Sequence, residues 1–280
     1  MKISIKIILF VLPTQLCNAQ YYYKDILATK EAVEKQRQYK VSNVRSVDVI
    51  STDAEERPEE GFVCRQQVAP DFLETDTYTK SRFNPESYQM TFFDSRGYII
   101  KTVDTSQKYY STTEYQFDMV GRLLKITNTS TETDNHFNDI EEHLWQYDPS
   151  GRPSKLLKVK NGTDTTYFHF VMDDKGDITE EHGVHEGEPL PTIYYYYNNS
   201  NQLTDIVRFN AAANRLLPDY IFTYNGHDAV ASMVMVPEGS TNYQRWAYQY
   251  DDKGLRTEEI CFDKQRQILG KIHYSYHFAR

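Results

Sequence analysis

The sequence predicts an all-β protein in which antiparallel β-hairpin repeats form a long twisted meander, as an open spiral or a barrel-like sheet, with one N-terminal helix. The first observation behind this prediction is a phrase, aromatic–x–aromatic–Asp–x–x–Gly, that recurs along most of the 280-residue chain. Its Asp or Asn anchors, at 94, 118, 148, 173, 198, 225 and 251, are separated by steps of 24 to 30 residues, a period typical of repeat architectures. The second observation is composition, because 23 Tyr and 14 Phe against 12 Gly and 10 Pro indicate a folded β-protein.

Residues 1–19 have the features of a cleaved signal peptide. Lysines give a positive start, an apolar stretch follows, and a small-residue site precedes Gln20. We therefore expect an exported protein, in the periplasm or outside the cell at its surface. The alternative is a lipoprotein acylated at Cys17, although the preceding Leu16 is bulky where such sites have a small residue.

Residues 20–40 are predicted to form an N-terminal helix that docks on the sheet. The stretch from Asp25 to Gln38 lacks Gly and Pro and is rich in Ala, Glu, Lys and Gln. A lone helix of this length is marginal in water, and docking would also protect a sheet edge. The expected apolar face is partial and consists of Ile26, Leu27, Ala28 and Val33.

Residues 41–280 are predicted to form a single β-repeat domain, because no stretch has the length or composition of a linker. Clear hairpin repeats begin at about residue 86. Strands are expected at 42–52 and 61–68, on either side of an acidic turn at 53–60. Segments 73–82 and 86–93 are expected to continue the meander into the first clear repeat.

Each recurring phrase predicts a hairpin with a tight turn. Two aromatics separated by one residue share a strand face, and the Asp or Asn side chain accepts backbone hydrogen bonds in a turn. Three residues later the Gly suits a type I turn followed by a left-handed residue and a bulge. Where Gly is absent, the position holds Asn or Asp, which best tolerate positive φ. The predicted turn positions are Asp94 and Gly97, Asp118 and Gly121, Asp148 and Gly151, Asp173 and Gly176, Asn198 and Asn201, Asn225 and Asp228, and Asp251 and Gly254.

The turn geometry also predicts the register of each hairpin. The residue before the Asp should lie opposite the residue two past the Gly, and most such pairs are aromatic–aliphatic. Proline at 153 would remove a ladder donor, so an edge, a bulge or a non-bonded site is expected there. The expected pairs are Phe93 with Ile99, Phe117 with Leu123, Tyr147 with Pro153, Met172 with Ile178, Tyr197 with Leu203, Tyr224 with Val230 and Tyr250 with Arg256.

This pattern resembles the YD repeats of the Rhs family, which join a tyrosine–aspartate pair to a glycine and an arginine at the turn. Asp118 to Arg122 and Asp148 to Arg152 match it best, and Tyr250-Asp251 also fits. The resemblance covers about residues 86–280 and implies an antiparallel β-meander. The layout is similar to small secreted YD-repeat proteins of Gram-negative bacteria, whose function is largely unassigned. The resemblance implies no catalytic residue.

The net charge limits the classes of partner that the protein is expected to bind. The chain has 31 basic and 40 acidic residues, a net charge of −9, and removing the two lysines of the signal peptide gives −11. Nucleic-acid binders normally present a basic face, so we expect no nucleic-acid partner. We also expect no integral membrane insertion, because alternate strand positions hold the polar residues Gln116, Gln146, Thr223 and Gln249.

Cys64 and Cys261 remain after signal removal, in an oxidising compartment. A disulfide requires Cα atoms within about 7 Å. The two residues lie near opposite ends of the repeat array, so they could meet only if the sheet closed on itself. Two separate buried thiols are the favoured interpretation, and the disulfide is left open.

A metal site is the second hypothesis for function. The segment 180–188 places His182 and His185 among four acids, and imidazole and carboxylate together can hold a divalent metal. The spacing matches no defined zinc motif, so a solvated loop is the favoured interpretation and we expect no cofactor. A metal-dependent hydrolase using 180–188 remains the alternative.

The tyrosine run at 194–197 suggests a binding surface. Tyr195 and Tyr197 fit the inner stripe of the repeat, which leaves Tyr194 and Tyr196 for the other face as candidate binding residues. The simpler interpretation is that tyrosine fills a wide repeat core. The sequence therefore predicts an exported, non-enzymatic binding module for a surface glycan or an envelope or cell-surface protein. A structural component of the envelope is a further alternative.

Overall fold

The structure is a computed structural model that describes residues 21–82, 86–106, 109–132, 138–210, 213–237 and 242–279. The predicted signal peptide lies outside these residues. The chain divides into two compact units, each made of segments distant in sequence. Among the described residues, the larger unit comprises Tyr22–Asp48, Glu60–Ile193 and residues 275–279, and the smaller unit comprises Tyr21, Val49–Glu59 and Tyr194–Tyr274.

The larger unit contains the helix and an antiparallel meander in which each strand pairs with the next along the chain. Its elements are α1 (Lys24–Ser42), β2 (Val63–Val68), β3 (Glu74–Lys80), β4 (Ser87–Phe93), β5 (Ile99–Ser106), β6 (Tyr109–Phe117), β7 (Leu123–Glu132), β8 (Asn138–Tyr147), β9 (Pro153–Lys160), β10 (Asp164–Met172), β11 (Ile178–His185) and β12 (Glu188–Pro189).

The smaller unit is also an antiparallel meander. Its strands are β14 (Leu203–Asn210), β15 (Arg215–Tyr224), β16 (Val230–Met235), β17 (Gln244–Tyr250) and β18 (Arg256–Phe262). Three strands have residues in both units, namely β1 (Val44–Thr52), β13 (Ile193–Tyr197) and β19 (Ile268–Phe278). The prediction of an all-β fold with one N-terminal helix is confirmed.

The predicted turns share one geometry. In each, the Asp or Asn side chain accepts hydrogen bonds from the backbone N–H groups two and four residues later, as Asp118 does from Val120 (3.0 Å) and Arg122 (2.9 Å). The fourth residue has positive φ, from 58° at Asn201 to 90° at Gly176. Because glycine lacks a Cβ, it adopts this conformation at little steric cost.

Two further turns of this kind have no glycine and were not predicted as repeats. Asp263 accepts hydrogen bonds from Gln265 (2.8 Å) and Gln267 (2.9 Å), and Arg266 has φ 64°. In the acidic segment, Asp53 accepts from the backbone of Glu55 and Arg57, both at 3.0 Å, and the fourth residue again has positive φ. The left-handed position of this turn therefore does not require glycine.

The register prediction is confirmed for six of the seven pairs, each with a bulge beside its turn, and the pair Tyr197 with Leu203 stays a prediction. At the bulge the pairing shifts by one residue, so Tyr147 lies opposite Pro153 although Gln146 lies opposite Lys155. Pro153 lies directly beside this bulge, whose extra residue is Ser154, and its missing N–H is tolerated there. The pairs that match the prediction are Phe93 with Ile99, Phe117 with Leu123, Tyr147 with Pro153, Met172 with Ile178, Tyr224 with Val230 and Tyr250 with Arg256.

Tyrosine hydroxyls connect neighbouring hairpins. Tyr147 donates to the carbonyl of Leu123 (2.8 Å), Tyr224 to Leu203 (2.7 Å) and Tyr250 to Val230 (2.9 Å). In each case the acceptor is the residue two past the left-handed position of the preceding turn. The tyrosine before the Asp thus has a role that phenylalanine cannot fill, because the hydroxyl joins one repeat to the previous one.

Consecutive turns also stack on one another. The residue after the left-handed position of one turn reaches the next turn: Tyr98 packs on Phe117 (5.0 Å between ring centroids), and the Arg122 guanidinium lies 5.0 Å from the Tyr147 ring. In the smaller unit, Gln202 Nε2 donates to Asp228 Oδ1 (2.9 Å). In these three places, a turn therefore contacts and supports its successor.

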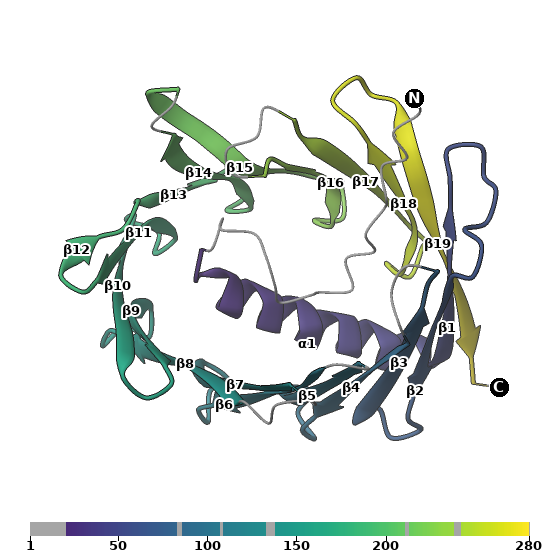
Figure 1. The fold of residues 1–280 in the computed structure, drawn as a ribbon, viewed down its shortest axis with the longest axis horizontal. Helices are drawn as coiled ribbons and strands as arrows, with labels where there is room; N and C mark the ends of the chain where they lie inside the picture. The colour runs from purple at the N-terminus through teal and green to yellow at the C-terminus, as the bar shows by residue number, and fades with distance from the viewer. Residues whose placement is uncertain are drawn as a thin grey trace. The chain divides into compact units, whose positions relative to one another are not determined.

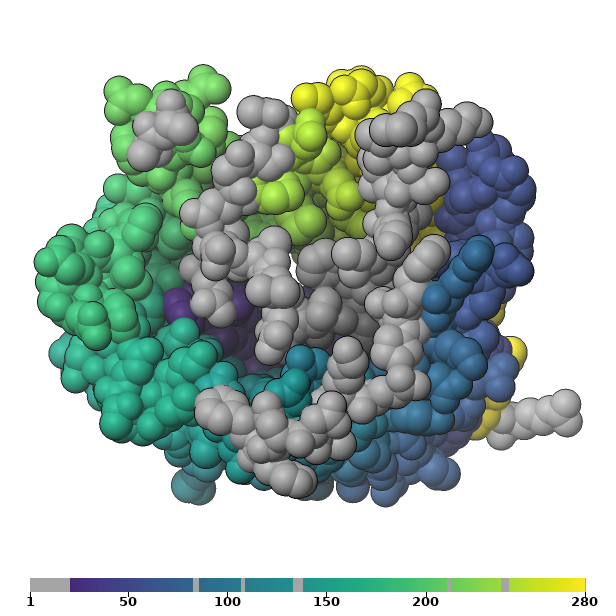
Figure 2. Space-filling view, in the orientation of Figure 1, coloured from purple at the N-terminus to yellow at the C-terminus, as the bar shows by residue number. Residues whose placement is uncertain are grey.

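The helix α1 lies along the concave side of the strands of its own unit (Figure 1), and part of it is visible behind the teal atoms of that unit (Figure 2). Its buried face is largely polar: Asp25, Ile26, Thr29, Gln36 and Tyr39. Gln36 donates to the carbonyl of Phe72, and the Tyr39 hydroxyl donates to Gln66 (2.9 Å). The predicted apolar face is therefore only partly correct, since Ala28 is exposed. Among the described residues, no helix has the length and apolar character needed to cross a membrane.

Both described cysteines are free and buried. Cys261 packs with Trp246 and Ile272 in the core of the smaller unit. Burial raises the pKa of Cys261 to about 12 and also raises the pKa of Cys64. Both therefore remain protonated at neutral pH, which makes them poor nucleophiles.

Turn stacking predicts different costs for two glycine substitutions. Gly97 (φ 87°) and Gly121 (φ 85°) are both left-handed, but a Cβ at position 97 meets nothing within 4 Å, whereas one at position 121 collides with the Tyr98 ring. We expect Gly97→Ala to lower the free energy of unfolding by about 1 kcal/mol through φ strain alone. Gly121→Ala should cost about 1–3 kcal/mol more, because Tyr98 must leave Phe117. Equal losses in urea denaturation would contradict turn stacking.

Candidate functional site

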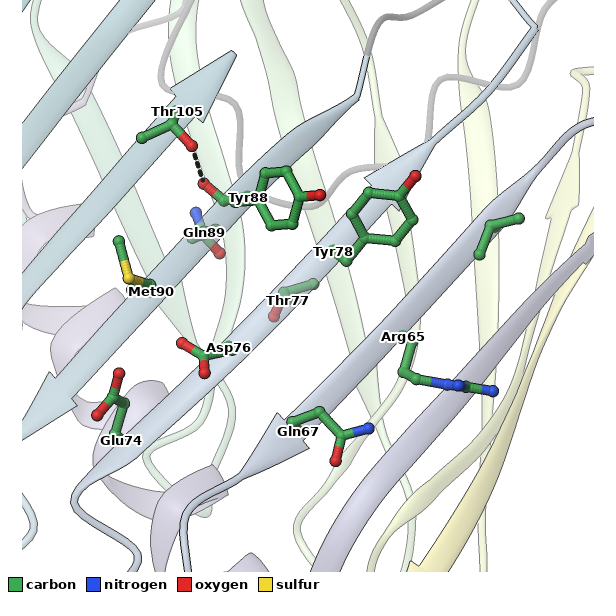
Figure 3. Close-up of a pocket in the computed structure, with 11 residues that line it drawn as sticks. Arg65, Gln67, Glu74, Asp76, Thr77, Tyr78, Tyr88, Gln89, Met90 and Thr105 are labelled. Carbon is green, nitrogen blue, oxygen red and sulfur yellow. Dashed lines mark hydrogen bonds between the residues drawn. The ribbon is translucent and has the colours of Figure 1, made fainter.

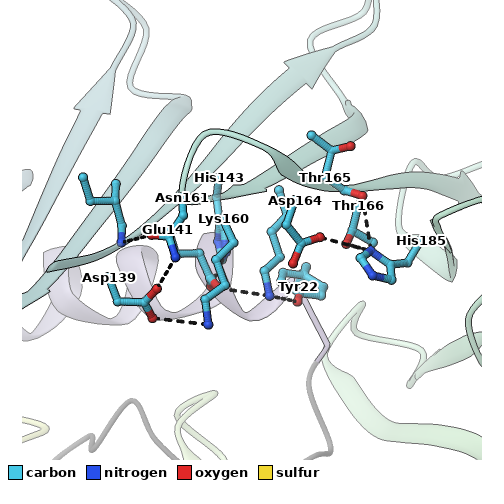
Figure 4. A network of polar contacts seen from close by, with 12 residues as sticks. Tyr22, Asp139, Glu141, His143, Lys160, Asn161, Asp164, Thr165, Thr166 and His185 are labelled. Atoms are coloured by element: carbon cyan, nitrogen blue, oxygen red, sulfur yellow. Dashed lines mark hydrogen bonds and ion pairs between the residues drawn. The ribbon is translucent and has the colours of Figure 1, made fainter. Parts of the chain in front are cut away.

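A cluster of charged side chains joins the start of α1 to strands β8 and β9 (Figure 4). His143 lies between two carboxylates, with Nδ1 2.6 Å from Asp25 Oδ2 and Nε2 3.0 Å from Glu141 Oε1. Lys158 Nζ lies 3.0 Å from Glu141 Oε2 and donates to the Tyr22 hydroxyl, also at 3.0 Å. Carboxylate, imidazolium and ammonium groups therefore alternate.

The electrostatics of this cluster favour its charged form. Burial alone would lower the pKa of His143, but the carboxylates of Asp25 and Glu141 outweigh it and raise that pKa to about 9. Burial would raise the pKa of Glu141, yet hydrogen bonds from His143 and Lys158 lower it to about 2. At neutral pH the cluster is a compensated set of buried charges.

A second carboxylate fixes the chain just before α1. Glu181 on β11 is 2% exposed, and it accepts hydrogen bonds from the backbone N–H groups of Tyr22 (3.0 Å) and Tyr23 (3.1 Å). Tyr23 precedes the helix and makes no capping hydrogen bond with its own side chain. Glu181 thus supplies an acceptor and a negative charge at a helix N-terminus. We interpret the cluster and Glu181 as the anchor of α1, because these groups are buried or half-buried and satisfy one another.

The interpretation of 180–188 as a solvated loop was wrong, because residues up to His185 belong to strand β11 and pair with β10. The two histidines proposed as metal ligands lie on opposite faces of this strand. His182 is directly opposite His169 on β10, and His185 is opposite Thr166. Because side chains alternate along a strand, residues three apart point to different faces. The structure therefore does not bring His182 and His185 together.

Each histidine has its own neighbours. His182 Nε2 lies 2.6 Å from Glu180 Oε2, and its ring stacks on His169 at 4.7 Å. His185 Nδ1 lies 3.1 Å from the Thr166 hydroxyl and 3.4 Å from Asp164 Oδ1. Across the part of the chain that the structure describes, no group of three or more His, Cys, Asp or Glu side chains is arranged to hold a metal ion.

The tyrosine run lies on β13. Tyr195 is 2% exposed, whereas Tyr196 is 47% exposed and Tyr194 is half-buried. Tyr194 and Tyr196 thus share the face opposite Tyr195, as the alternation of strand side chains requires.

A groove of about 640 Å³ lies on β2–β5 of the larger unit (Figure 3). Its volume falls in the range of small-ligand sites. Cross-strand pairs place its main side chains on one face: Arg65 opposite Tyr78, Tyr78 opposite Tyr88, and Asp76 opposite Met90. The α1 side of the same strands carries the alternate residues, such as Gln66, which contacts Tyr39. The groove therefore opens on the face away from the helix.

The groove combines aromatic rings with hydrogen-bonding groups. The Tyr78 and Tyr88 rings are 5.0 Å apart at 46°, and Tyr88 is 52% exposed. Glu74 and Asp76 line the groove beside them, and burial followed by the Asp76 charge raises the pKa of Glu74. Arg65 is held by Asp48 (2.6 Å), so its charge is already compensated. The site is amphipathic and carries excess negative charge.

This groove was not predicted from the recurring phrase. One clue was available, because Tyr88 stands five residues before the inward-facing Phe93 and so belongs on the opposite face of the same strand. The pairing of Tyr88 with Tyr78 had no comparable clue. The connection between these strands lacks the Asp–x–x–Gly phrase from which register was predicted.

Comparisons with known proteins give distant likenesses. No protein-family model and no curated protein matches the chain. A porin-like protein from Bacteroides uniformis is 8% identical over 84% of this chain and 97% of that chain, with a TM-score of 0.42. A TcdB2–TccC3–TEV structure is 11% identical over 77% of this chain and 12% of that chain, with a TM-score of 0.36. The Photorhabdus luminescens Tc holotoxin pore is 12% identical over 77% and 15% of the two chains, with a TM-score of 0.30. These likenesses assign neither fold nor activity to this chain.

The anchor cluster predicts a pH-dependent stability. Because the pKa of His143 is raised from 6.5 to about 9, its contribution is complete below about pH 6.5 and is lost as the pH rises through 9. Glu141, with its pKa lowered from 4.5 to about 2, contributes above about pH 4.5 and loses this contribution as the pH falls through 2. We expect His143→Gln to lower Tm by several degrees at pH 6 and to flatten the Tm decline between about pH 6.5 and 9.

The control for this experiment is His227→Gln, an exposed histidine of the Asn225 turn in the smaller unit, which should keep the wild-type pH profile. Thermal unfolding followed by circular dichroism measures both variants. A decline of the same size in wild type and His143→Gln would show that the cluster does not control stability in this range.

Proposed function

We propose that this protein is an exported, non-enzymatic binding module that holds a neutral glycan in the groove on β2–β5. The single observation that carries the proposal is the pair Tyr78 and Tyr88 beside Glu74 and Asp76 in one open groove. Export rests on the signal peptide expected at residues 1–19, and the cell envelope or its surface is the corresponding location.

The chemistry of a sugar matches this arrangement. A sugar ring has an apolar face of C–H groups and a rim of hydroxyls, so it can stack on tyrosine while its hydroxyls bond to polar neighbours. Carboxylates accept such hydrogen bonds, and the Gln67 amide can both donate and accept. The acidic residues and the chain's net charge of −9 disfavour an anionic polymer.

We also propose that the chain is related to the YD-repeat family. Each part of the phrase has a physical role that supports this relation. Asp118 anchors its turn, Gly121 adopts the left-handed position, Arg122 reaches the ring of the next turn, and Tyr147 bonds to the previous hairpin. The four residue types therefore depend on one another structurally, which a chance pattern would not.

The test compares two exposed tyrosines. Tyr88 is 52% exposed in the groove and Tyr196 is 47% exposed on β13, so alanine at either position should leave folding intact. We expect Tyr88→Ala to weaken binding to neutral β-glucan, mannan or chitin oligomers about tenfold, or ~1.4 kcal/mol. Tyr196→Ala should leave the dissociation constant unchanged. Calorimetric titration of the purified mature protein measures both.

Other outcomes would overturn the proposal. If Tyr196→Ala weakens binding and Tyr88→Ala does not, the binding surface is the one predicted from the tyrosine run on β13. If no neutral oligomer binds the wild-type protein, the proposed ligand class is wrong.

A further inference from the structure

The groove belongs to a longer row of side chains that crosses five strands. Residues directly opposite one another on consecutive strands are Arg65, Tyr78, Tyr88, Thr105 and Tyr110. We call this set the tyrosine row. Because directly paired residues of antiparallel strands point to the same face, all five side chains share the face that carries the groove.

We propose that the ligand is an extended glycan chain of several sugar rings that lies along the tyrosine row, across the strands, with Tyr110 as a subsite outside the groove. This inference rests on the proposed function. Strands lie about 4.8 Å apart, so Tyr110 is two spacings, or about 10 Å, from Tyr88. The row from Arg65 to Tyr110 spans four spacings, or about 19 Å. A single sugar ring cannot contact both tyrosines.

Exposure supports a ligand that follows the row. Tyr88 is 52% exposed and Tyr110 is 47% exposed, so both rings offer a face to a ligand. Thr105 separates them on β5, and its hydroxyl donates to the carbonyl of Tyr88 at 3.3 Å, which keeps that side chain low between the rings. Two exposed rings separated by a small side chain form two stacking positions on one line.

The next row along the strands has a different character. It holds Gln67 opposite Asp76, and Asp76 opposite Met90. Met90 is half-buried. On β3, Glu74 lies two residues before Asp76 and so is one row further from the tyrosine row. These groups flank the tyrosine row with hydrogen-bond acceptors, which suits the hydroxyl rim of a chain whose ring faces stack on tyrosine.

The aromatic part of the row ends on β6. On β7 the residue opposite Tyr110 is Thr131, and its hydroxyl is already bonded to Asn138 at 2.7 Å. The row therefore offers two positions on which a sugar ring can stack. One is the pair Tyr78 and Tyr88, the other is Tyr110, and no aromatic side chain follows on β7. The ligand length that the row can contact is correspondingly limited.

The experiment measures affinity against chain length. Neutral β-glucan, mannan and chitin oligomers of two to five rings are titrated into wild type, Tyr110→Ala and Tyr109→Ala. Tyr109 is a matched control, because it is 54% exposed on the same strand and its side chain points to the opposite face. We expect Tyr110→Ala to weaken binding of the four- and five-ring oligomers about fivefold or more, to leave two-ring binding unchanged, and Tyr109→Ala to change neither.

The result separates this inference from the proposed function. If Tyr88→Ala weakens binding at every length but Tyr110→Ala weakens none, the groove holds a short ligand and the extended chain is overturned. Equal losses for short and long oligomers in Tyr110→Ala would also overturn it, because a remote subsite acts only on long ligands. If Tyr88→Ala changes nothing at any length, the proposed function itself fails.

Discussion

The left-handed fourth residue of each Asp- or Asn-anchored turn is the constraint on which the rest of the fold depends. It produces the bulge that sets the pairing of each hairpin, and a shift of one residue would move every side chain to the other face of the strand. With the register set, the hydroxyl of Tyr147 meets the carbonyl of Leu123, and the arginine at 122 meets the next turn. The contacts between repeats thus follow from geometry within each repeat.

The sequence predicted the strand pairing that the turn geometry determines. It did not identify as repeats the turns whose fourth residue is neither Gly, Asn nor Asp. Register and the bulge beside Pro153 could be predicted, because both depend on a few neighbouring residues. The turns at Asp53 and Asp263 were not predicted as repeats, since Glu56 and Arg266 occupy the position expected to hold Gly, Asn or Asp. The anchoring carboxylate, which supplies two hydrogen bonds per turn, is therefore more informative than the glycine.

The docking of α1 depends on pairs that no local pattern contains. Asp25 meets His143 118 residues later, and Tyr22 meets Glu181 159 residues later. Periodicity detects an apolar stripe, and this helix docks mainly through charged and polar groups, so the predicted apolar face was only partly correct. A helix attached in this way depends on the complete set of charges, because a buried charge left without its partner is strongly destabilising.

The two faces of each strand have different roles, and this difference explains why the candidate site could not be predicted from the sequence. Repeat positions such as Tyr147 and Tyr195 face inward and carry the packing, so a run of tyrosines is conspicuous in sequence without marking a ligand surface. A row that crosses strands takes one residue from each, and Tyr78, Tyr88 and Tyr110 stand 10 and 22 residues apart. Because these outward positions take no part in the turns or the inward packing, substitutions there leave the contacts of the repeat intact.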